Sequence, residues 1–353
     1  MSEDISAELV ASIATAYEDN TPLQILGGNT KGFYGRVPVG MPLAITGHEG
    51  IVNYEPTELV VSVRAGTRLS YLKSILAESG QMLAFDPPMF GPAATVGGMV
   101  ASGFSGPARP YRGSVRDAIL GVQIINGKGH QLHFGGEVMK NVAGYDVSRL
   151  MVGALGTLGV VLQASFKVLP APEVNRTLVF SCSEEEALYQ MNRWAGQALP
   201  LTGAAYLARQ MYVRLSGSED SVSSAAREIG GDQGKSADDW WDSLRDHKLS
   251  FFERNAPLWR LSVPPAASPL DMPGDSLIDW GGAQRWFFSN MPATEVRGGV
   301  RETGGHSTLF RGGDRSGEVF ETLHGTQARL HVALKRAFDP GGIINRGRMV
   351  KDW

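Results

Sequence analysis

Glycine-rich segments beside basic and hydroxyl residues are the feature of this sequence that most clearly suggests chemistry. Four of them follow one another along the chain, at 27–36, 94–117, 140–160 and 345–348. Glycine has no Cβ, so backbone N–H groups can approach a phosphate closely, and successive N–H groups form an anion-binding nest. Each segment alone is also typical of a tight turn. Four together, each with Lys, Arg, Ser or Thr nearby, favour a pyrophosphate ligand.

Familiar nucleotide and metal motifs do not account for these segments. No Gly-x-Gly-x-x-Gly occurs, and Gly153-x-x-Gly156-x-x-Gly159 opens a predicted strand where a dinucleotide fold needs a helix. Gly234-Lys235-Ser236 is similar to the end of a P-loop, but Ile229 stands where the motif needs its first glycine. The histidines show no metal-ligand spacing. A single cysteine excludes a disulfide, a zinc–thiolate site or an iron–sulfur cluster within the chain.

Mixed helix and strand patterns must position the glycine-rich segments. The predicted elements of the first half are a helix over 5–17, strands over 23–26, 43–46 and 59–64, a helix from Thr67 as its cap to Gly80, and a buried strand over 158–169. Asn126-Gly127, a dipeptide that two-residue hairpins prefer, lies between apolar runs at 118–125 and 130–134. The sheet is therefore expected to be at least partly antiparallel.

A domain boundary is predicted at Pro170-Ala171-Pro172, because proline continues neither a helix nor a central strand. The elements predicted beyond it are strands over 177–180, 211–215 and 258–263, helices over 184–194, 221–229 and 238–245, and a last helix over 319–338. This alternation is typical of a small α+β layer domain. Dense aromatic residues at 240–241 and 286–288 are compatible with a core or with a partner surface.

Composition and charge exclude several classes of protein. The chain has 353 residues with a net charge of −3, so no strong positive field would hold nucleic acid. The uncharged run 150–166 is too short and too polar for a membrane-spanning helix, which needs about 20 apolar residues. The acidic N-terminus has no secretory signal pattern, so we expect a cytoplasmic protein. The 44 glycines are unevenly distributed: 24 lie in 1–170, 11 in 171–300 and 9 in 301–353.

Four stretches carry a resemblance to a known family over nearly the whole chain. They are Gly97-Gly-Met-Val-Ala, Gly113-Ser-Val-Arg-Asp117, Phe134-Gly-Gly-Glu-Val-Met-Lys-Asn-Val-Ala-Gly-Tyr-Asp146 and Asp339-Pro-Gly-Gly-Ile-Ile-Asn-Arg-Gly-Arg-Met349. The chain resembles flavoproteins of the p-cresol methylhydroxylase and vanillyl-alcohol oxidase type, and among them the FAD-binding subunits of glycolate oxidase. The resemblance implies an α+β FAD-binding domain at 1–171, an inserted α+β cap domain at 172–312, and a segment at 313–353 that returns to the FAD domain.

The resemblance also implies a set of residues that contact FAD. Gly27 to Lys31 correspond to the pyrophosphate loop, and Gly97, Gly98 and Ser102 to the segment under the flavin ring. Arg348 would stabilise the negative charge of the reduced ring near its N1–C2=O edge. The full set is Gly27, Gly28, Asn29, Thr30, Lys31, Gly97, Gly98, Ser102, Arg116, Asp117, Gly153, Gly156, Thr157, Gly159, Val160, Asn345 and Arg348.

Two departures from the superfamily pattern affect the expected chemistry. Covalent members place a histidine where this chain has Asn29, so FAD is expected to be held non-covalently. The catalytic sister subunits carry a His-x-Gly-Asp-Gly-Asn segment, and the nearest fragment here, 312–314, has no such histidine before it. No metal site is expected.

Oxidation of a 2-hydroxy acid needs a hydride acceptor, a base for the hydroxyl proton and a cation for the carboxylate. His306 could be the base and Arg311 the cation, with Arg297 and Arg301 as further candidates. A structural or solvent-exposed role is the more common one for an isolated histidine or arginine. The catalytic set is therefore incomplete in this sequence.

The resemblance implies a function within an assembly. We expect an FAD-binding subunit of a complex that oxidises glycolate to glyoxylate, with a catalytic flavoprotein subunit and an iron–sulfur subunit as partners. Any contact with the inner face of a membrane would come through those partners. Two alternatives stay open: a stand-alone FAD dehydrogenase of another hydroxy acid or polyol, and a flavin-fold scaffold without a working site.

Overall fold

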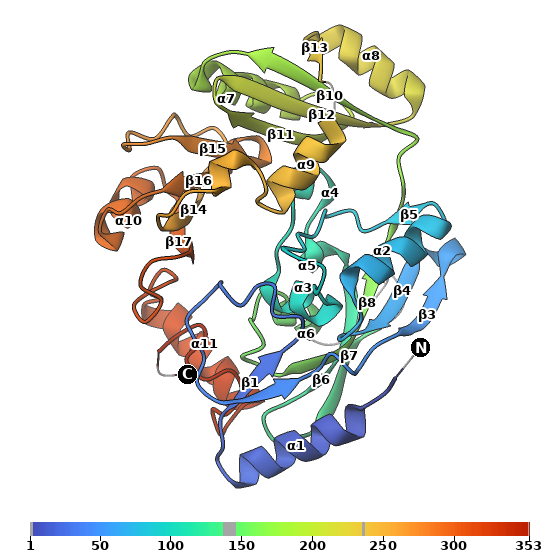
Figure 1. Cartoon of the computed structure of the whole chain (residues 1–353), viewed down its shortest axis with the longest axis vertical. Helices are drawn as coiled ribbons and strands as arrows, with labels where there is room; N and C mark the ends of the chain where they lie inside the picture. The colour runs from blue at the N-terminus through green and yellow to red at the C-terminus, as the bar shows by residue number, and fades with distance from the viewer. Residues whose placement is uncertain (1–2, 137–145, 235–236, 352) are drawn as a thin grey trace. The chain divides into compact units, whose positions relative to one another are not determined.

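The computed structural model describes residues 3–136, 146–234, 237–351 and 353. The chain forms two compact units (Figure 1). Unit 1 comprises Met1–Phe104, Ser114–Ala171 and Arg315–Trp353, and unit 2 comprises Ser105–Gly113 and Pro172–Asp314. The segment 105–113 lies within the range 1–171 that the sequence analysis gives to the FAD domain, but here it groups with unit 2.

Unit 1 is built on antiparallel strands with helices against them. Its helices are α1 (Ser6–Glu18), α2 (Leu69–Glu78), α3 (Val96–Ser102), α5 (Val115–Ala118), α6 (Val147–Met151) and α11 (Gly325–Phe338), with the 3₁₀ helix η1 (Pro56–Glu58). Its strands are β1 (Leu23–Leu26), β2 (Met41–Ala44), β3 (Ile51–Glu55), β4 (Val60–Arg64), β5 (Gln81–Met82), β6 (Ile119–Ile125), β7 (Gln131–Gly135), β8 (Val160–Lys167) and β9 (Leu169–Pro170).

Within the described residues, the main sheet of unit 1 has the strand order β3-β4-β8-β6-β7, and every neighbouring pair is antiparallel. Two short sheets, the parallel pair β1-β2 and the antiparallel pair β5-β9, complete it. Strand β8 is central, and its side chains are buried on both faces, apart from the half-buried Gln163 and the exposed Lys167 at its end. Helix α3 packs on β4 and β8, and α6 packs on β6 and β7. The expected antiparallel pairing is confirmed.

The C-terminal segment returns to the start of unit 1. Ile344 pairs in parallel with Leu23, whose backbone N–H donates to Ile343 O at 2.7 Å. Below this turn, Lys335 and Asp339 form a buried ion pair at 2.6 Å. The Lys335 ammonium also donates to the carbonyls of Thr157 and Ile344, at 2.8 and 3.0 Å. The pair therefore fixes α11 and the tail to the loop before β8.

Unit 2 is an eight-stranded sheet, counted over the described residues, in the order β13-β10-β12-β11-β15-β16-β14-β17. Its strands are β10 (Val174–Ser181), β11 (Leu201–Leu207), β12 (Gln210–Gly217), β13 (Asp232–Gln233), β14 (Leu258–Ser262), β15 (Ser276–Asp279), β16 (Gln284–Phe288) and β17 (His306–Arg311). Its helices are α4 (Arg109–Arg112), α7 (Glu184–Ala195), α8 (Glu219–Ile229), α9 (Ala237–Arg245) and α10 (Ala293–Arg301), with the 3₁₀ helices η2 (Ser250–Phe252) and η3 (Trp280–Gly282).

The aromatic residues of unit 2 lie mainly in its core. Trp241, Trp286, Phe287 and Phe288 are all buried. Trp240 is half-buried and stacks on Tyr212, with the ring centroids 3.9 Å apart. Packing within the unit therefore accounts for these residues.

Three local predictions were wrong. Thr67 does not cap α2; its hydroxyl accepts from Gly50 N at 2.8 Å, and the extended Arg68 is the capping residue. The Asn126-Gly127 dipeptide is not a two-residue turn, because Gly129 supplies the positive φ while Gly127 donates to Phe338 O at 2.8 Å. The last helix begins at Gly325 and not at Val319, because His324 has an extended backbone.

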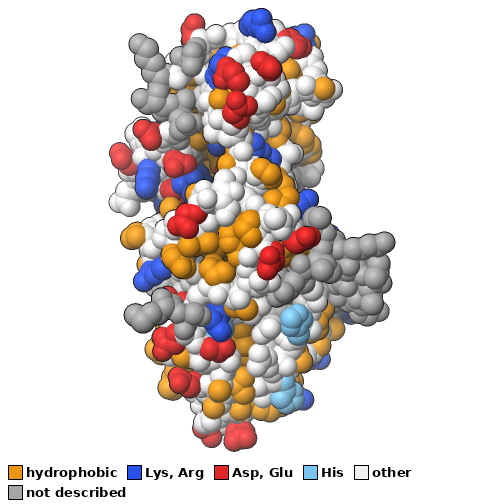
Figure 2. Space-filling view, turned by 90° about the vertical axis from the view of Figure 1, so that its right-hand side faces the viewer, with side chains coloured by type: hydrophobic (Ala, Val, Ile, Leu, Met, Phe, Trp, Pro, Cys, Tyr) orange, Lys and Arg blue, Asp and Glu red, His pale blue; other side chains and the backbone are white. Residues whose placement is uncertain are grey.

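The surface carries both signs of charge. Figure 2 shows acidic and basic side chains interspersed over one face, with hydrophobic side chains between them. Among the helices of the described ranges, none is long and apolar enough to cross a bilayer.

Candidate functional site

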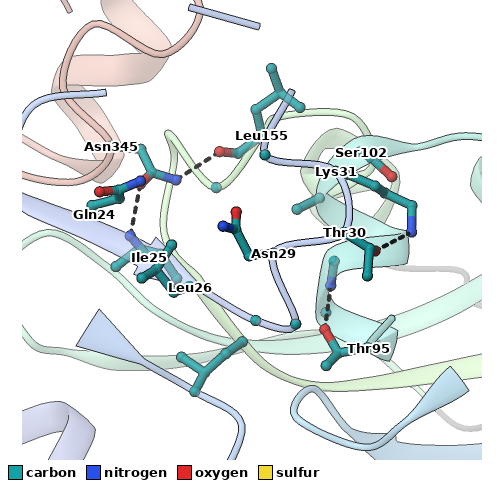
Figure 3. A pocket seen from close by; sticks show the side chains of 18 of the residues that line it. Gln24, Ile25, Leu26, Asn29, Thr30, Lys31, Thr95, Ser102, Leu155 and Asn345 are labelled. Atoms are coloured by element: carbon teal, nitrogen blue, oxygen red, sulfur yellow. Dashed lines mark hydrogen bonds between the residues drawn. The ribbon is translucent and has the colours of Figure 1, made fainter. Parts of the chain in front are cut away.

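A cavity in unit 1 collects segments that are far apart in the sequence (Figure 3). Its walls come from the end of β1 with the loop after it, from the start of α3, from the turn before β8 and from the C-terminal tail. The lining residues are Gln24, Ile25, Leu26, Gly27, Gly28, Asn29, Thr30, Lys31, Gly32, Pro38, Ile45, Thr95, Gly97, Gly98, Ala101, Ser102, Leu155, Gly156, Asn345 and Arg348.

The loop after β1 presents a row of backbone donors. No acceptor within the described ranges takes a hydrogen bond from the backbone N–H groups of residues 27–30. The loop packs tightly against residues 93–95, because a Cβ on Gly28 would overlap the Ala93 carbonyl and one on Gly27 would lie 2.5 Å from Thr95 Oγ1. Glycine is therefore required there for close packing, which leaves the N–H groups of the loop available to an anion.

Helix α3 forms a second wall made of small residues. Thr95 caps it, and its hydroxyl accepts from Gly98 N at 3.2 Å. A Cβ on Gly97 would lie 2.9 Å from that of Ala65, inside the protein. A Cβ on Gly98 would meet only Thr95 Oγ1, at 3.2 Å, within 4 Å. Gly97 thus serves internal packing, whereas Gly98 leaves space in the cavity.

Three lining residues other than glycine have a left-handed backbone. They are Asn29, Leu155 and Asn345, with φ of 52°, 51° and 46°. Such conformations cost of order 1–3 kcal/mol and cluster at ligand sites. The Asn29 side chain makes no hydrogen bond within the described part of the chain, and Figure 3 shows it between the tail and the helix that carries Ser102.

Asn345 joins three of the cavity's walls. Its Oδ1 accepts from Ile25 N at 2.8 Å, and its Nδ2 donates to Leu155 O at 2.8 Å. Its backbone N–H donates to Leu23 O at 2.8 Å. Both ends of its carboxamide are thus engaged, so Asn345 shapes the cavity through protein contacts.

Positive charge enters the cavity from two side chains. The Arg348 guanidinium donates to Lys31 O and Gly32 O, at 3.4 and 3.5 Å. It forms no ion pair with a carboxylate of the described residues. Burial, with a smaller contribution from nearby Arg315, lowers the pKa of Arg348 to about 10, so the group stays charged at neutral pH. The Lys31 ammonium donates to Met89 O at 3.3 Å and lies 5.8 Å from the centroid of the Phe90 ring.

No described lining residue is a histidine, an aspartate or a glutamate. The cavity therefore offers hydrogen-bond donors and cations. It lacks a side chain with the pKa of a general base at neutral pH.

The structure brings eleven of the seventeen predicted cofactor residues together in this cavity, and six lie elsewhere. Those in the cavity are Gly27, Gly28, Asn29, Thr30, Lys31, Gly97, Gly98, Ser102, Gly156, Asn345 and Arg348. Those outside its lining are Arg116, Asp117, Gly153, Thr157, Gly159 and Val160.

The residues outside the lining have structural contacts or face solvent. Asp117 accepts from the backbone N–H and the hydroxyl of Ser114, at 2.9 and 2.7 Å, at the start of α5. Arg116 is exposed. Thr157 is buried, with its hydroxyl donating to Ala154 O at 2.7 Å. Val160 is in the core, and a Cβ on Gly159 would lie 2.8 Å from Ile125 O.

The weak catalytic candidates belong to unit 2. His306 is exposed at the start of β17. Arg311 ends the same strand and donates to Phe252 O at 3.3 Å, and burial lowers its pKa. Neither lines the unit 1 cavity. Residues 137–145, which include the start of the glycine-rich segment 140–160, lie outside the described residues. The same holds for Lys235 and Ser236 of the P-loop-like segment.

Sequence reasoning missed Thr95 and Leu155 among the lining residues. Thr95 precedes Gly97 in the position of a helix cap, a signal that could have identified it. Leu155 could not have been found, because an apolar residue gives no sign that its backbone will be left-handed. In the part of the chain that is described, no group of three or more His, Cys, Asp or Glu side chains could hold a metal ion.

Comparisons with known proteins identify the family of the chain. A family model described as an FAD binding domain matches residues 5–135. The chain is 46% identical over 346 residues to glycolate oxidase subunit GlcE of Escherichia coli (strain K12). The aligned region covers 98% of this chain and 97% of that protein. It is 30% identical over 175 residues to glycolate oxidase subunit GlcD of Bacillus subtilis (strain 168), covering 49% of this chain and 37% of that protein.

More distant similarities exist in sequence and in structure. A D-lactate dehydrogenase of Anaerostipes hadrus is 27% identical over 228 residues, 60% of this chain and 48% of that protein. A solved structure of alkyldihydroxyacetonephosphate synthase covers 96% of this chain and 74% of that one, with a TM-score of 0.68 and 15% identity. At this identity the likeness shows the fold alone. Together with the matched domain, it confirms the expected fold class, an FAD-binding domain of the p-cresol methylhydroxylase type.

Proposed function

The chain belongs to the GlcE family of glycolate oxidase subunits, and from this we propose that it is the FAD-binding subunit of a complex that oxidises glycolate to glyoxylate. The family match confirms the resemblance carried by the sequence motifs. It also confirms FAD as the cofactor and an oxidoreductase acting on CH–OH donors as the class. The site residues, the substrate and the partners are parts of the proposal.

The cavity of unit 1 suits the two halves of FAD. The N–H groups of residues 27–30 and the Lys31 ammonium would hold the pyrophosphate, because both supply positive potential and no described lining residue is a carboxylate. Gly98 would leave room for a flat ring against α3. The Asn29 carboxamide, which makes no hydrogen bond within the described residues, would bind the cofactor instead. With asparagine at this position, the cofactor would be held without a covalent bond.

Bound FAD supplies hydride or electron acceptance at its ring. The role of this chain is then to bind the ring and to stabilise the negative charge that reduction places on it. Arg348 would serve that role, since no carboxylate of the described residues forms an ion pair with its guanidinium. A cation at this place would raise the potential of the flavin.

The absence of a general base among the described lining residues is the observation that carries the proposal. Oxidation of a 2-hydroxy acid needs a group to accept the hydroxyl proton. A cavity with cations, amides and hydroxyls alone can hold a flavin and relay electrons, but it does not complete that reaction. We therefore assign substrate oxidation to a partner flavoprotein subunit, and onward electron transfer to an iron–sulfur subunit. We place the complex in the cytoplasm, with any membrane contact made through the partners.

Co-purification tests the proposal. The tagged chain is expected to bring down its partners, and the complex should reduce a dye when given glycolate. The isolated chain, although it contains FAD, should not do so. Reduction of the dye by the isolated chain would instead support a stand-alone dehydrogenase. A chain that takes up no FAD would support a scaffold.

The choice of substrate needs a comparison within the same assay. Relatives over part of the chain are named D-lactate and D-2-hydroxyglutarate dehydrogenases. Glycolate, D-lactate and D-2-hydroxyglutarate should be offered to the complex at equal concentration. The highest kcat/KM is expected for glycolate, and a higher value for either of the others would change the assigned substrate.

A further inference from the structure

A second arginine, Arg315, lies behind the cavity of unit 1. Its Nε donates to Gly35 O at 2.6 Å, and its terminal nitrogen donates to Gly32 O at 2.9 Å. It therefore joins the first residues of the C-terminal segment to the loop that follows the pyrophosphate segment. Arg315 does not line the cavity, and no sequence motif pointed to it.

Arg315 and Arg348 converge on the same short stretch of backbone. Gly32 O accepts from both guanidinium groups, at 2.9 and 3.5 Å. Gly35 separates them: its carbonyl accepts from Arg315, and a Cβ at this position would lie 3.3 Å from Arg348 Nε. With a φ of 79°, Gly35 has a backbone conformation that favours glycine. The loop is shaped to admit two guanidinium groups side by side.

No carboxylate of the described ranges neutralises the two positive charges, because neither arginine forms an ion pair there. Both are half-buried, and the hydrogen bonds of each to described residues go to main-chain carbonyls. Like charges at short range repel more strongly where water is partly excluded. An anion in the cavity would relieve that repulsion.

We propose that Arg315 is a positioning residue for the cofactor, which braces the loop 31–35 through two carbonyls and adds a second positive charge behind Arg348 toward an anionic group of FAD. The proposal rests on the proposed function, since it takes FAD as the ligand. The anionic group is the pyrophosphate or the N1–C2=O edge of the reduced ring. Both groups are anionic, and the binding experiments with ADP and FAD distinguish between them.

Three variants separate charge from bracing. Arg315→Gln removes the charge and retains one donor group, whereas Arg315→Lys retains the charge and loses the fork geometry. Arg36→Gln is the matched control. Arg36 also donates to carbonyls of the C-terminal segment, at Gly347 and Gly317, but it lies outside the lining of this cavity. Thermal unfolding of each variant shows whether the fold is retained.

The probes are ADP, which carries a pyrophosphate without a flavin, and FAD. Binding of both is measured at low and at high salt, and the midpoint potential of bound FAD is measured by dye equilibration. For Arg315→Gln we expect affinity for FAD to fall about tenfold at low salt, and its salt dependence to weaken. Arg315→Lys should keep the salt dependence of the wild type, and Arg36→Gln should keep both its affinity and its salt dependence.

The two sources of negative charge give different outcomes. A loss of ADP affinity in Arg315→Gln places the pyrophosphate near the arginine pair. Unchanged ADP binding with a lower flavin potential places the ring there. The proposal is overturned if Arg315→Gln matches the wild type in affinity, salt dependence and potential, or if Arg36→Gln shows the same changes. If Arg315→Gln does not fold, Arg315→Lys decides. A folded Arg315→Lys that keeps the FAD affinity and the salt dependence of the wild type supports the charge role, whereas one whose FAD affinity falls as far as its stability does overturns it. A wild-type chain that binds no FAD would instead contradict the proposed function itself.

Discussion

At the scale of single residues, the chemistry of the cavity depends on the positive charge of Arg348. Among the described residues, the hydrogen bonds of its guanidinium go to main-chain carbonyls and none goes to a carboxylate, so its charge is available to a ligand. Lys31 adds a second cation from the opposite end of the chain. The two residues are 317 positions apart and meet because the tail returns beside β1.

Replacement of Arg348 should therefore weaken FAD binding and lower the flavin potential. A hydrogen bond to a charged group contributes about 1.5–3 kcal/mol, so Arg348→Gln should lose roughly ten- to a hundredfold in FAD affinity. Flavin fluorescence titration measures the affinity, and spectroelectrochemistry measures the potential. Arg329→Gln, on exposed α11, is the control and should behave as the wild type. An unchanged potential in Arg348→Gln would remove the assigned role.

The affinity for FAD should also depend on pH through the same group. Burial lowers the pKa of Arg348 from its ordinary value to about 10. The cation is present below the lowered pKa and is lost as the pH rises through it. FAD affinity of the wild type should therefore be constant around neutral pH and fall near pH 10. Any change with pH that Arg348→Gln also shows comes from other groups and is subtracted. Parallel profiles of the wild type and the variant across that range would contradict this assignment.

At this scale, sequence reasoning selected Gly27, Gly28 and Arg348, and the structure brings all three to the lining of one cavity. A close backbone approach needs glycine and an anion needs a cation, and contact of these residues with FAD stays a prediction. Arg315 was missed because its role depends on the tertiary position of two carbonyls. Asp117 was included through its motif, but the structure engages it in the cap of α5.

At the scale of elements, helix α3 separates packing from ligand binding in two adjacent glycines. A Cβ on Gly97 would press on Ala65, whereas one on Gly98 would enter the cavity. Gly97→Ala should cost about 1–3 kcal/mol through overpacking. Gly98→Ala should not lower stability, because alanine favours a helix by about 1 kcal/mol over glycine, yet it should reduce FAD affinity.

Thermal unfolding without FAD and FAD titration together check this pair of variants. The expected pattern is a lower Tm for Gly97→Ala and weaker binding for Gly98→Ala. Equal Tm values with equal affinities would show that α3 does not form a wall of the cofactor site.

The junction between α11 and the tail should depend on its buried ion pair. Lys335→Met leaves the Asp339 carboxylate buried without its cation, and loss of one partner of such a pair costs about 3–5 kcal/mol. Asp339 also accepts from the backbone N–H groups of Ile343 and Ile344, at 3.1 and 2.9 Å. Asp339→Asn should therefore disturb the tail and, with it, Arg348.

Denaturant unfolding measures the cost of each substitution. The double variant Lys335→Met with Asp339→Asn should lose less than the sum of the two single variants, since no lone charge is left buried. Additive losses would show that the two groups act independently.

Element prediction was accurate where periodicity was long and poor where tertiary contacts decide. The predicted strand at 158–169 is observed as β8 over Val160–Lys167, because its apolar run is long enough to identify a central strand. The turn predicted after β6 was wrong because Gly127 N donates a hydrogen bond to Phe338 O, a contact that local sequence does not reveal. The predicted start of the last helix was wrong because the extended backbone of His324 interrupts a sequence pattern that is otherwise helical.

At the scale of the whole molecule, the distribution of glycine follows the division into two units only loosely. Unit 1 holds 27 of the 44 glycines in 201 residues and unit 2 holds 17 in 152, because six glycines of 105–113 and 301–314 belong to unit 2. The difference between the units is therefore smaller than the one between the sequence ranges 1–170 and 171–300. The substrate and the partners leave no trace in composition, and they entered only through family membership.

The central claim is that unit 1 binds FAD non-covalently in the cavity that Arg348 lines. The most direct measurement is the flavin released by acid from the purified chain, together with the flavin released from Gly98→Val, whose side chain would occupy the cavity. The wild type should release close to one FAD per chain as the free, yellow cofactor, and a folded Gly98→Val should release almost none. Equal amounts of FAD from both proteins, or flavin that stays with the precipitate, would contradict the account.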